Sequence, residues 1–122
     1  MRKMTYMTKS MGTCLMTVSK GEIYLASVLF SNLEGIKIRP VLIVFCEEDD
    51  DDVIGVFLTS QQARDSLDIP IERWQEAGLI KPSVVRTSKP GTYHQNRLLK
   101  KLGTLNNEEF ARVLNACQSI YQ

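Results

Sequence analysis

The residues most capable of binding or catalysis are an arginine beside one apolar run and two hydroxyl residues at the end of the next. Arg39 precedes Pro40 and the run VLIVF, and Thr59 and Ser60 follow the run VIGVFL. An unpaired buried charge is costly, so an arginine at the entrance of a buried strand must face water or hold an anion. If the two runs pair as an antiparallel hairpin in the right register, the Thr59 hydroxyl comes close to the guanidinium.

The composition restricts what such a site could be. The chain has 122 residues with 15 basic and 14 acidic side chains, so its formal charge of +1 gives no global attraction to an anionic partner. An anion site must therefore be built locally from a few placed cations. The three cysteines, Cys14, Cys46 and Cys117, are odd in number and widely spaced, and His94 is the only histidine. This pattern argues against a disulfide framework and a zinc site and favours a reducing cytosol, and we expect neither metal nor cofactor.

The length allows one domain, which we place at residues 19–122. Residues 1–18 contain all five methionines, at partly helical spacing, but polar residues interrupt every apolar stretch. This segment lacks the apolar core of a signal peptide and the roughly 20 apolar residues of a membrane span. We interpret it as a poorly ordered extension, with a docking helix as the alternative, and we expect no contact with a membrane.

Behind the candidate site, the pattern predicts mostly strands. Apolar and β-branched stretches bounded by turn residues indicate six strands, at 19–30, 41–46, 53–58, 67–71, 83–88 and 98–102. Pro70 places the fourth strand at an edge. Residues 72–78 are expected to form one or two helical turns, and residues 106–122 a helix with Asn106 as its N-cap. The fold class is therefore mainly β (α+β), a small and strongly bent antiparallel barrel or two-layer sheet with a C-terminal α-helix.

Two conspicuous features receive structural rather than functional interpretations. The acidic run at 47–52 has no calcium-loop spacing and no intervening glycine, so we predict a solvated hairpin loop instead of a cation site. The single tryptophan, Trp74, is expected to pack on the barrel rather than to stack on a nucleic-acid base.

The order of these motifs resembles the MazF/PemK family of toxins from bacterial toxin–antitoxin pairs. The likeness covers residues 19–121 and rests on Arg39-Pro40-Val41, on Thr59-Ser60 and on KLGTLNNEEFARV at 101–113. The resemblance implies an SH3-like barrel, a homodimer and a cytoplasmic, metal-independent endoribonuclease that cuts single-stranded RNA at short sequences. It also implies a cognate antitoxin protein that holds the toxin inactive.

The resemblance assigns roles that fit the chemistry of metal-free RNA cleavage. That reaction needs a base for the attacking 2′-hydroxyl, positive charge for the phosphate and an acid for the leaving oxygen. Arg39 would grip the phosphate, Thr59 would orient it, and Glu34, five residues before Arg39, is the candidate base or RNA contact. The further candidates for RNA binding are Ser60, Lys37, Arg86, Lys89 and His94.

One segment departs from the family pattern. Many relatives carry a cation before a threonine and an acid two residues after it, whereas residues 90–94 read PGTYH, with Gly91 and His94 at those places. We read this segment as a loop, in which His94 is either an acid near neutral pH or a surface residue. Two other functions stay open: a gyrase-poisoning toxin on the same barrel, and a catalytically inactive binding module.

Overall fold

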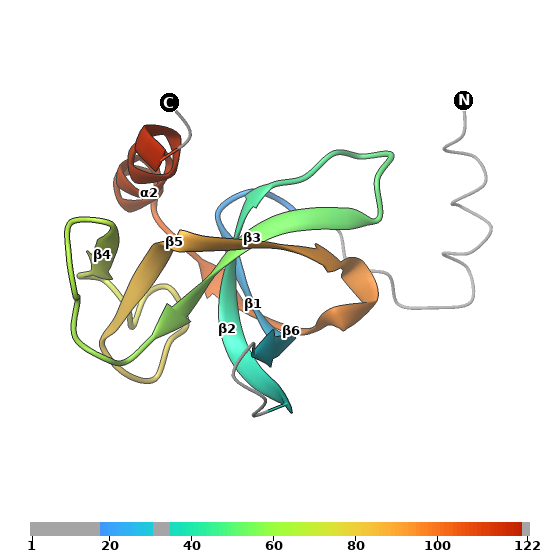
Figure 1. Ribbon diagram of the computed structural model, residues 1–122, viewed down its shortest axis with the longest axis horizontal. Coiled ribbons are helices and arrows are strands. Elements are labelled where there is room, and N and C mark those ends of the chain that lie inside the picture. The colour runs from blue at the N-terminus through green and yellow to red at the C-terminus, as the bar shows by residue number, and fades with distance from the viewer. Residues whose placement is uncertain (1–17, 31–34, 121–122) are drawn as a thin grey trace.

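The computed structural model describes residues 18–30 and 35–120, which form one strongly bent antiparallel sheet and a C-terminal helix (Figure 1). The long central strands are β1 (Glu22–Phe30), β2 (Gly35–Phe45), β3 (Asp52–Thr59) and β5 (Ser83–His94). Two shorter strands are β4 (Asp68–Ile71) and β6 (Leu98–Thr104), the latter preceded by the short 3-10 helix η1 (Gln95–Arg97), and the chain continues into helix α2 (Asn107–Ile120). The predicted fold class is confirmed.

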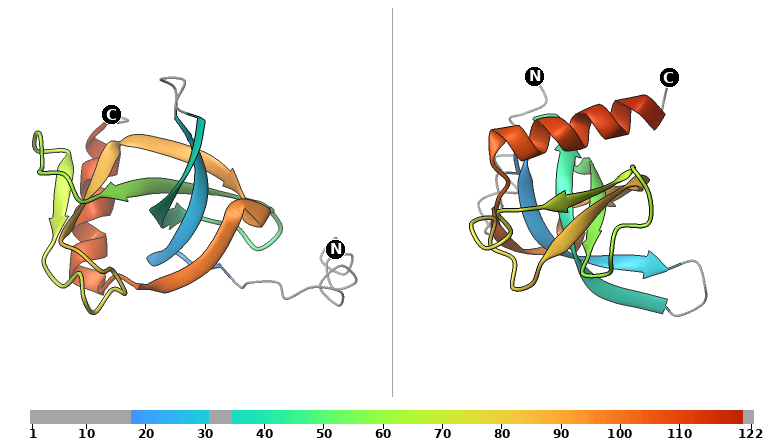
Figure 2. Two further views of the ribbon diagram at one scale, coloured as in Figure 1. Left: turned by 90° about the horizontal axis from the view of Figure 1, so that it is seen from below. Right: turned by 90° about the vertical axis from the view of Figure 1, so that its left-hand side faces the viewer.

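The six strands follow the order β4-β5-β3-β2-β1-β6. Every neighbouring pair is antiparallel, and the edge strands β4 and β6 do not pair with each other, so the sheet stays open. The predicted edge position of the strand that contains Pro70 is confirmed. Figure 2 shows that the sheet curls strongly into a partial barrel, in which the end of β5 and the start of β6 meet at the short helix η1.

Both faces of the sheet are packed, because neighbouring residues along each strand enter different cores. On β1, Ile23 belongs to a core that the helix covers, while the next residue, Tyr24, belongs to the core inside the curled sheet. On β2, Leu42 and Val41 divide in the same way. This double burial explains why these strands read as nearly continuous apolar runs instead of a strict alternation.

Helix α2 packs against β4 and β5 (Figure 2). The Asn106 side chain accepts a hydrogen bond of 2.9 Å from the Glu109 backbone N–H, so the predicted N-cap is confirmed. Val113 and Cys117 are buried in the core beneath the helix, and Phe110 packs beside them.

Strands β2 and β5 extend furthest beyond their predicted ranges. Strand β2 begins at Gly35, so Arg39 lies in the middle of a strand and not at its entrance, because residues 35–38 pair with the second half of β1. Strand β5 continues to His94, so the prediction of a loop at residues 90–94 is wrong. A register shift in the β3–β5 ladder, next to the Val56–Pro90 pair, accommodates the proline, and the buried Tyr93 anchors the segment in the inner core.

Residues 72–78 form consecutive hydrogen-bonded turns instead of the predicted helical turns. The backbone N–H groups of Glu72 and Arg73 donate to the buried Glu109 carboxylate, at 2.7 and 3.3 Å, so α2 fixes the start of this segment. So short a segment gains little from helix propagation. Trp74 packs against the helix-covered core, as predicted.

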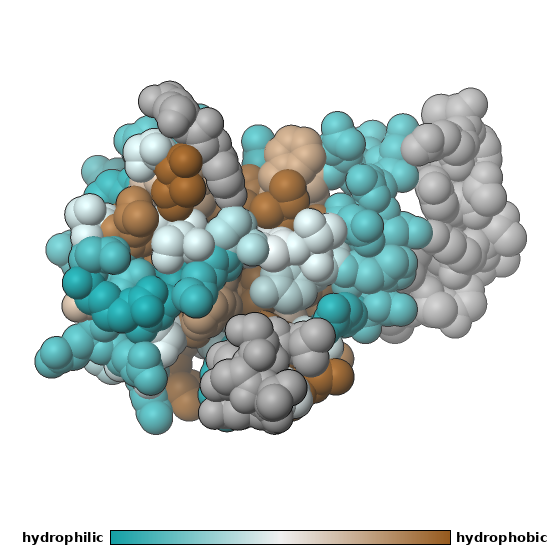
Figure 3. Space-filling view, viewed as in Figure 1, coloured by the Kyte–Doolittle hydropathy of each residue, from teal (hydrophilic) through white to brown (hydrophobic). Residues whose placement is uncertain are grey.

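The loop that follows β2 is exposed at residues 47–50, and this confirms the predicted acidic hairpin loop. It contributes to the hydrophilic surface at the upper right of Figure 3, where Figure 1 shows the β2–β3 connection. Within the described part of the chain, no helix combines the length and the apolar character needed to cross a membrane. The interpretation of the N-terminal extension concerns residues that lie, apart from Val18, outside the described ones.

Candidate functional site

The β2–β3 hairpin brings Arg39 and Thr59 to the same place. Val41 lies opposite Phe57 in the antiparallel register, and continuing that register by two residues puts Arg39 opposite Thr59. Because side chains two residues apart share one face of a strand, both side chains leave the hairpin on the same side. The register of the hairpin up to the Val41–Phe57 pair therefore agrees with the one that the sequence-based hypothesis requires.

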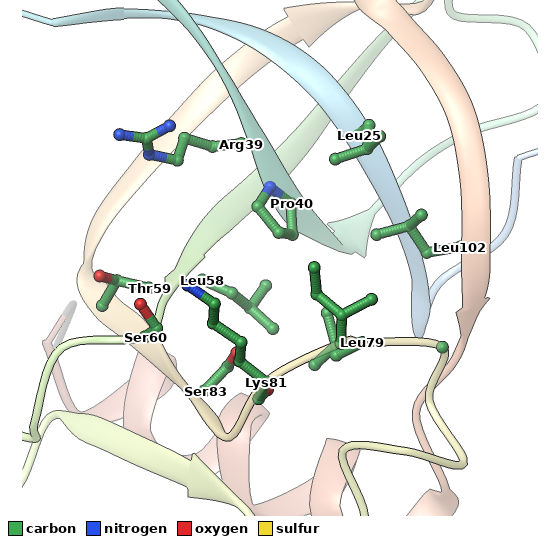
Figure 4. A pocket seen from close by; sticks show the side chains of 12 residues that line it. Leu25, Arg39, Pro40, Leu58, Thr59, Ser60, Leu79, Lys81, Ser83 and Leu102 are labelled. Atoms are coloured by element: carbon green, nitrogen blue, oxygen red, sulfur yellow. The ribbon is translucent and has the colours of Figure 1, made fainter.

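Arg39 and Thr59 line one pocket of about 390 Å³. Its polar lining is completed by Ser60, Lys81 and Ser83, and its apolar lining comes from leucine, isoleucine and proline side chains of several segments: Leu25, Pro40, Leu58, Leu79, Ile80 and Leu102. In Figure 4 the Arg39 guanidinium lies above Thr59 and Ser60, and the Lys81 ammonium lies near Ser60 and Leu58. Leu25, Leu79 and Leu102 lie on the other side of the view. The pocket thus combines two cations and hydroxyl donors with an apolar wall.

Local hydrogen bonds orient the polar groups of the pocket. The Arg39 Nη1 donates to the Ile38 carbonyl at 3.0 Å, which holds the guanidinium against its own strand. The Thr59 Oγ1 accepts from the Gln61 backbone N–H at 3.2 Å. Because that hydroxyl oxygen is engaged as an acceptor, its own hydrogen is available to donate to an anion in the pocket. The Ser83 hydroxyl donates to the Lys81 carbonyl at 3.0 Å and fixes the backbone of the loop that carries Lys81.

Two glycines set the position of the pocket wall formed by residues 78–81. Gly78 has φ +89, a conformation that other residues rarely adopt, and a Cβ on it would collide with the Leu102 carbonyl of β6. A Cβ on Gly103 would likewise collide with the Ala77 carbonyl. The turn segment and β6 therefore meet backbone to backbone, which brings Leu79 and Lys81 over the end of the β2–β3 hairpin.

The comparison with protein families decides what kind of domain carries this pocket. The model of the PemK-like, MazF-like toxins of type II toxin–antitoxin systems matches residues 19–121. The chain belongs to this family. The family membership inferred from the sequence motifs is thereby confirmed, over the same part of the chain.

Solved structures of MazF proteins share the fold at low sequence identity. The chain is similar to the Mycobacterium tuberculosis toxin MazF-mt6, with a TM-score of 0.68 and 22% identity, over 82% of this chain and 95% of that one. It is also similar to MazF from Deinococcus radiodurans, with a TM-score of 0.69 and 15% identity, over 87% and 97% of the two chains. A mycobacterial endoribonuclease in complex with its cognate antitoxin gives a TM-score of 0.71 at 16% identity, over 86% and 95%. No curated protein matches the sequence significantly.

The MazF/PemK fold places the other predicted site residues at different distances from the pocket. Ser60 lines it, and Lys37 lies two residues before Arg39 on the same face of β2. Lys89 is exposed on β5 and is not part of the pocket lining. His94 pairs with Asp52 at the far end of β3, seven residues from Thr59, which is roughly 23 Å along the strand. Glu34 lies outside the described residues.

Arg86 occupies a different environment from the one expected of an RNA-binding residue. Its side chain is only 4% exposed, and its Nη1 donates to the Asp68 carboxylate at 3.0 Å while its Nη2 donates to the Gln61 side chain at 3.1 Å. A guanidinium buried in these contacts does not reach a phosphate in solvent. The structure therefore argues against Arg86 as a direct RNA contact.

Lys81 lines the pocket but was not among the residues predicted for the site. This residue stands between Ile80 and Pro82 in an irregular segment, where an isolated lysine carries no recognisable pattern. It becomes part of the pocket only because the backbone contact between Gly78 and Gly103 folds its segment over the hairpin. Within the described residues, no group of three or more His, Cys, Asp or Glu side chains is arranged to hold a metal ion.

Proposed function

We propose that this MazF/PemK toxin is a metal-independent endoribonuclease that cuts single-stranded RNA at selected sequences. The observation that supports the proposal is that Arg39 and Thr59, from two strands, line one pocket together with Lys81. A binding module would not require these groups to converge. The pocket also has room and apolar surface beside its cations, which suits a nucleotide whose base and phosphate are bound together.

In the proposed reaction the pocket binds the scissile phosphate. Arg39 donates two hydrogen bonds to the non-bridging phosphate oxygens, a geometry that suits its planar guanidinium. Thr59 donates its hydroxyl hydrogen to the same group and fixes its orientation. The Lys81 ammonium adds a second positive charge, which stabilises the extra negative charge of the pentacoordinate phosphorane. Because Arg39 and Thr59 lie on strands of the sheet, little reorganisation of these two donors accompanies the reaction.

The chemical step is an attack by the ribose 2′-oxygen on the adjacent phosphorus. The 2′-hydroxyl gives its proton to a base, the new P–O bond forms, and the bond to the 5′-oxygen breaks. The products are a 2′,3′-cyclic phosphate and a 5′-hydroxyl, which takes up a proton from an acid. We propose Glu34 as the base, because it belongs to the segment between β1 and β2, five residues before Arg39. His94, at the end of β5 and opposite Asp52 of β3, lies too far from Thr59 to be the acid of this pocket.

The same pocket suggests how a cognate antitoxin acts. A site that binds phosphates through Arg39 and Lys81 also binds carboxylates, so an acidic and apolar antitoxin segment can occupy it and exclude RNA. We further propose that the toxin works in the cytoplasm as a homodimer. The side chains of Ile36 and Ile38 on β2 are 64% and 47% exposed, and they offer an apolar surface for association.

The decisive experiment incubates the purified protein with a long single-stranded RNA of mixed sequence in the presence of a chelator. We expect wild type to cut the RNA at a limited set of sites, each leaving a 2′,3′-cyclic phosphate. Arg39→Ala should lower the rate by at least about 100-fold, the usual effect of removing one donor to a developing anion. Arg112→Ala removes an exposed cation on α2 and serves as the matched control, with wild-type cleavage expected.

A different result would select one of the other functions. If wild type leaves RNA intact and Arg39→Ala still arrests growth when expressed, the ribonuclease proposal is wrong. Inhibition of DNA supercoiling by the same protein would then indicate a gyrase-poisoning toxin. Absence of both activities would indicate a binding module.

A further inference from the structure

A buried ion pair lies behind the turn that carries Thr59. Asp68 on β4 pairs with Arg86 on β5, and the Arg86 Nη1 donates to the Asp68 Oδ2 at 3.0 Å. The two side chains are 0% and 4% exposed. The same carboxylate oxygen also accepts from the Arg64 backbone N–H at 2.8 Å, which ties the preceding loop to the pair. The guanidinium is therefore held by the sheet in a fixed orientation.

The second terminal nitrogen of the Arg86 guanidinium connects the buried ion pair to the pocket. While Nη1 holds Asp68, the Arg86 Nη2 donates to the Gln61 Oε1 at 3.1 Å. The Gln61 backbone N–H in turn donates to the Thr59 Oγ1 at 3.2 Å. A chain of three hydrogen bonds thus connects a fully buried carboxylate with the hydroxyl that faces the pocket.

The turn from Thr59 to Gln61 needs such support. Ser60 and Gln61 are exposed, and β3 ends at Thr59, so the sheet does not hold the residues that follow. Lysine at position 86 could not replace arginine here, because a single ammonium lacks the planar fork that reaches two acceptors on different segments. From the resemblance to the MazF/PemK family we expected Arg86 to contact RNA, but the burial of its side chain argues against this role.

We infer that Asp68, Arg86 and Gln61 are positioning residues for Thr59. The inference rests on the proposed ribonuclease function, since Thr59 is assigned there to the phosphate. Arg86 fixes the Gln61 side chain and with it the turn, so that the backbone N–H of residue 61 occupies the acceptor side of the Thr59 hydroxyl. The hydroxyl hydrogen then points into the pocket and meets the phosphate without prior rotation.

Substitution of Gln61 tests the inference without disturbing the buried pair. Gln61→Ala removes the acceptor for Arg86, Gln61→Glu keeps an acceptor oxygen, and Gln62→Ala changes an exposed neighbour as the control. The substrate is a short fluorescent RNA that contains one site cut by wild type. We expect Gln61→Ala to lower kcat about tenfold with KM nearly unchanged. The variant should stay folded at the assay temperature, although its melting temperature falls because the Arg86 Nη2 loses its acceptor. Gln61→Glu should keep most of the activity, and Gln62→Ala all of it.

Two kinetic outcomes would overturn the inference. If Gln61→Ala has the same kcat as wild type, the contact between Arg86 and Gln61 does not position Thr59. If Gln61→Glu loses as much activity as Gln61→Ala, or raises KM in a salt-dependent way, the amide contacts RNA directly instead of serving Arg86.

A measurement without RNA separates this inference from the proposed function. Hydrogen exchange of the residue-61 backbone amide, followed by NMR, should be several-fold faster in Gln61→Ala than in wild type. Equal exchange rates would show that the contact between Arg86 and the Gln61 side chain does not fix the turn, even if the protein cuts RNA. Failure of wild type to cut RNA, with the exchange difference present, would overturn the ribonuclease function and leave the anchor in place.

Discussion

The buried pair of Asp68 and Arg86 allows a quantitative prediction from a double-mutant cycle. Arg86→Met replaces the guanidinium by an apolar side chain of similar length, and Asp68→Asn removes the charge while keeping an acceptor for the Arg64 backbone N–H. Arg86→Met leaves the buried Asp68 carboxylate with only the half-exposed Arg64 guanidinium, 3.4 Å away, as a counter-charge. Asp68→Asn removes the charge that the Arg86 guanidinium, whose side chain is 4% exposed, faces in the interior. Breaking such a pair from one side costs about 3–5 kcal/mol.

The double variant should be far more stable than the sum of the two single changes implies. It carries no buried charge, and its main defect is the new side-chain amide at position 68, whose N–H group lacks an acceptor at a cost of about 1–3 kcal/mol. If the single losses were additive, their sum would be about 6–10 kcal/mol. The expected coupling is therefore at least about 3 kcal/mol, well above the roughly 0.5 kcal/mol within which independent sites add.

Urea denaturation followed by circular dichroism at low temperature is the suitable assay. A chain of this length is expected to have about 6–18 kcal/mol of total stability, so at least the less affected single variants remain folded at zero urea. Singles that each lose less than about 1 kcal/mol would refute the reasoning. Losses that simply add in the double variant would also refute it, because the two groups would then not stabilise each other.

Three further predictions concern other parts of the molecule. Burial alone would raise the pKa of Glu22, but hydrogen bonds from Lys101, the Ser19 N–H and the Tyr24 hydroxyl outweigh it and lower the pKa below its ordinary 4.5. The Glu22 carboxylate therefore stabilises the folded protein above pH 4.5, and this contribution is lost as the pH falls through the lowered pKa. In a plot of the urea midpoint against pH, Glu22→Gln should show a smaller decrease on the acid side than wild type. Parallel curves for the two proteins would contradict this prediction. Gly103→Ala should lower stability by about 1–3 kcal/mol, because the new methyl group meets a backbone carbonyl, and an unchanged melting curve would show that the wall adjusts. Thr59→Val should slow RNA cleavage at least about tenfold with the melting temperature unchanged, and an unfolded variant by circular dichroism would make Thr59 a structural residue.

The local sequence pattern predicted the elements that depend on nearby residues. Apolar runs between turn residues located the core strands, and Asn106 with the acids after it marked the start of the helix. The ends of strands were less predictable, since they depend on pairing partners. Residues 35–38 become strand because β1 continues opposite them, and Pro90-Gly91 remains in β5 because a register shift accommodates it.

The positions of the site residues were likewise predictable only where they depend on segments that are close in the chain. Arg39 and Thr59 were predictable because one hairpin relates them, and the register of that hairpin follows from its two apolar runs. Lys81 was not predictable, because its place depends on a contact between two distant glycines. The burial of Arg86 was not predictable, because its partner, Asp68, lies 18 residues earlier in the chain and meets it only through the β4–β5 register.

The contact between Gly78 and Gly103 has a consequence for how this domain can diversify. The side chains that line the pocket come from separate segments, so each can be exchanged singly to alter which ligand fits. The two glycines determine whether the wall closes over the hairpin at all, and neither position accepts a Cβ while the opposite backbone stays where it is. Evolution of specificity within this scaffold is therefore expected to proceed through the lining residues, whereas a change at either glycine would have to be accompanied by a shift of the 72–81 segment.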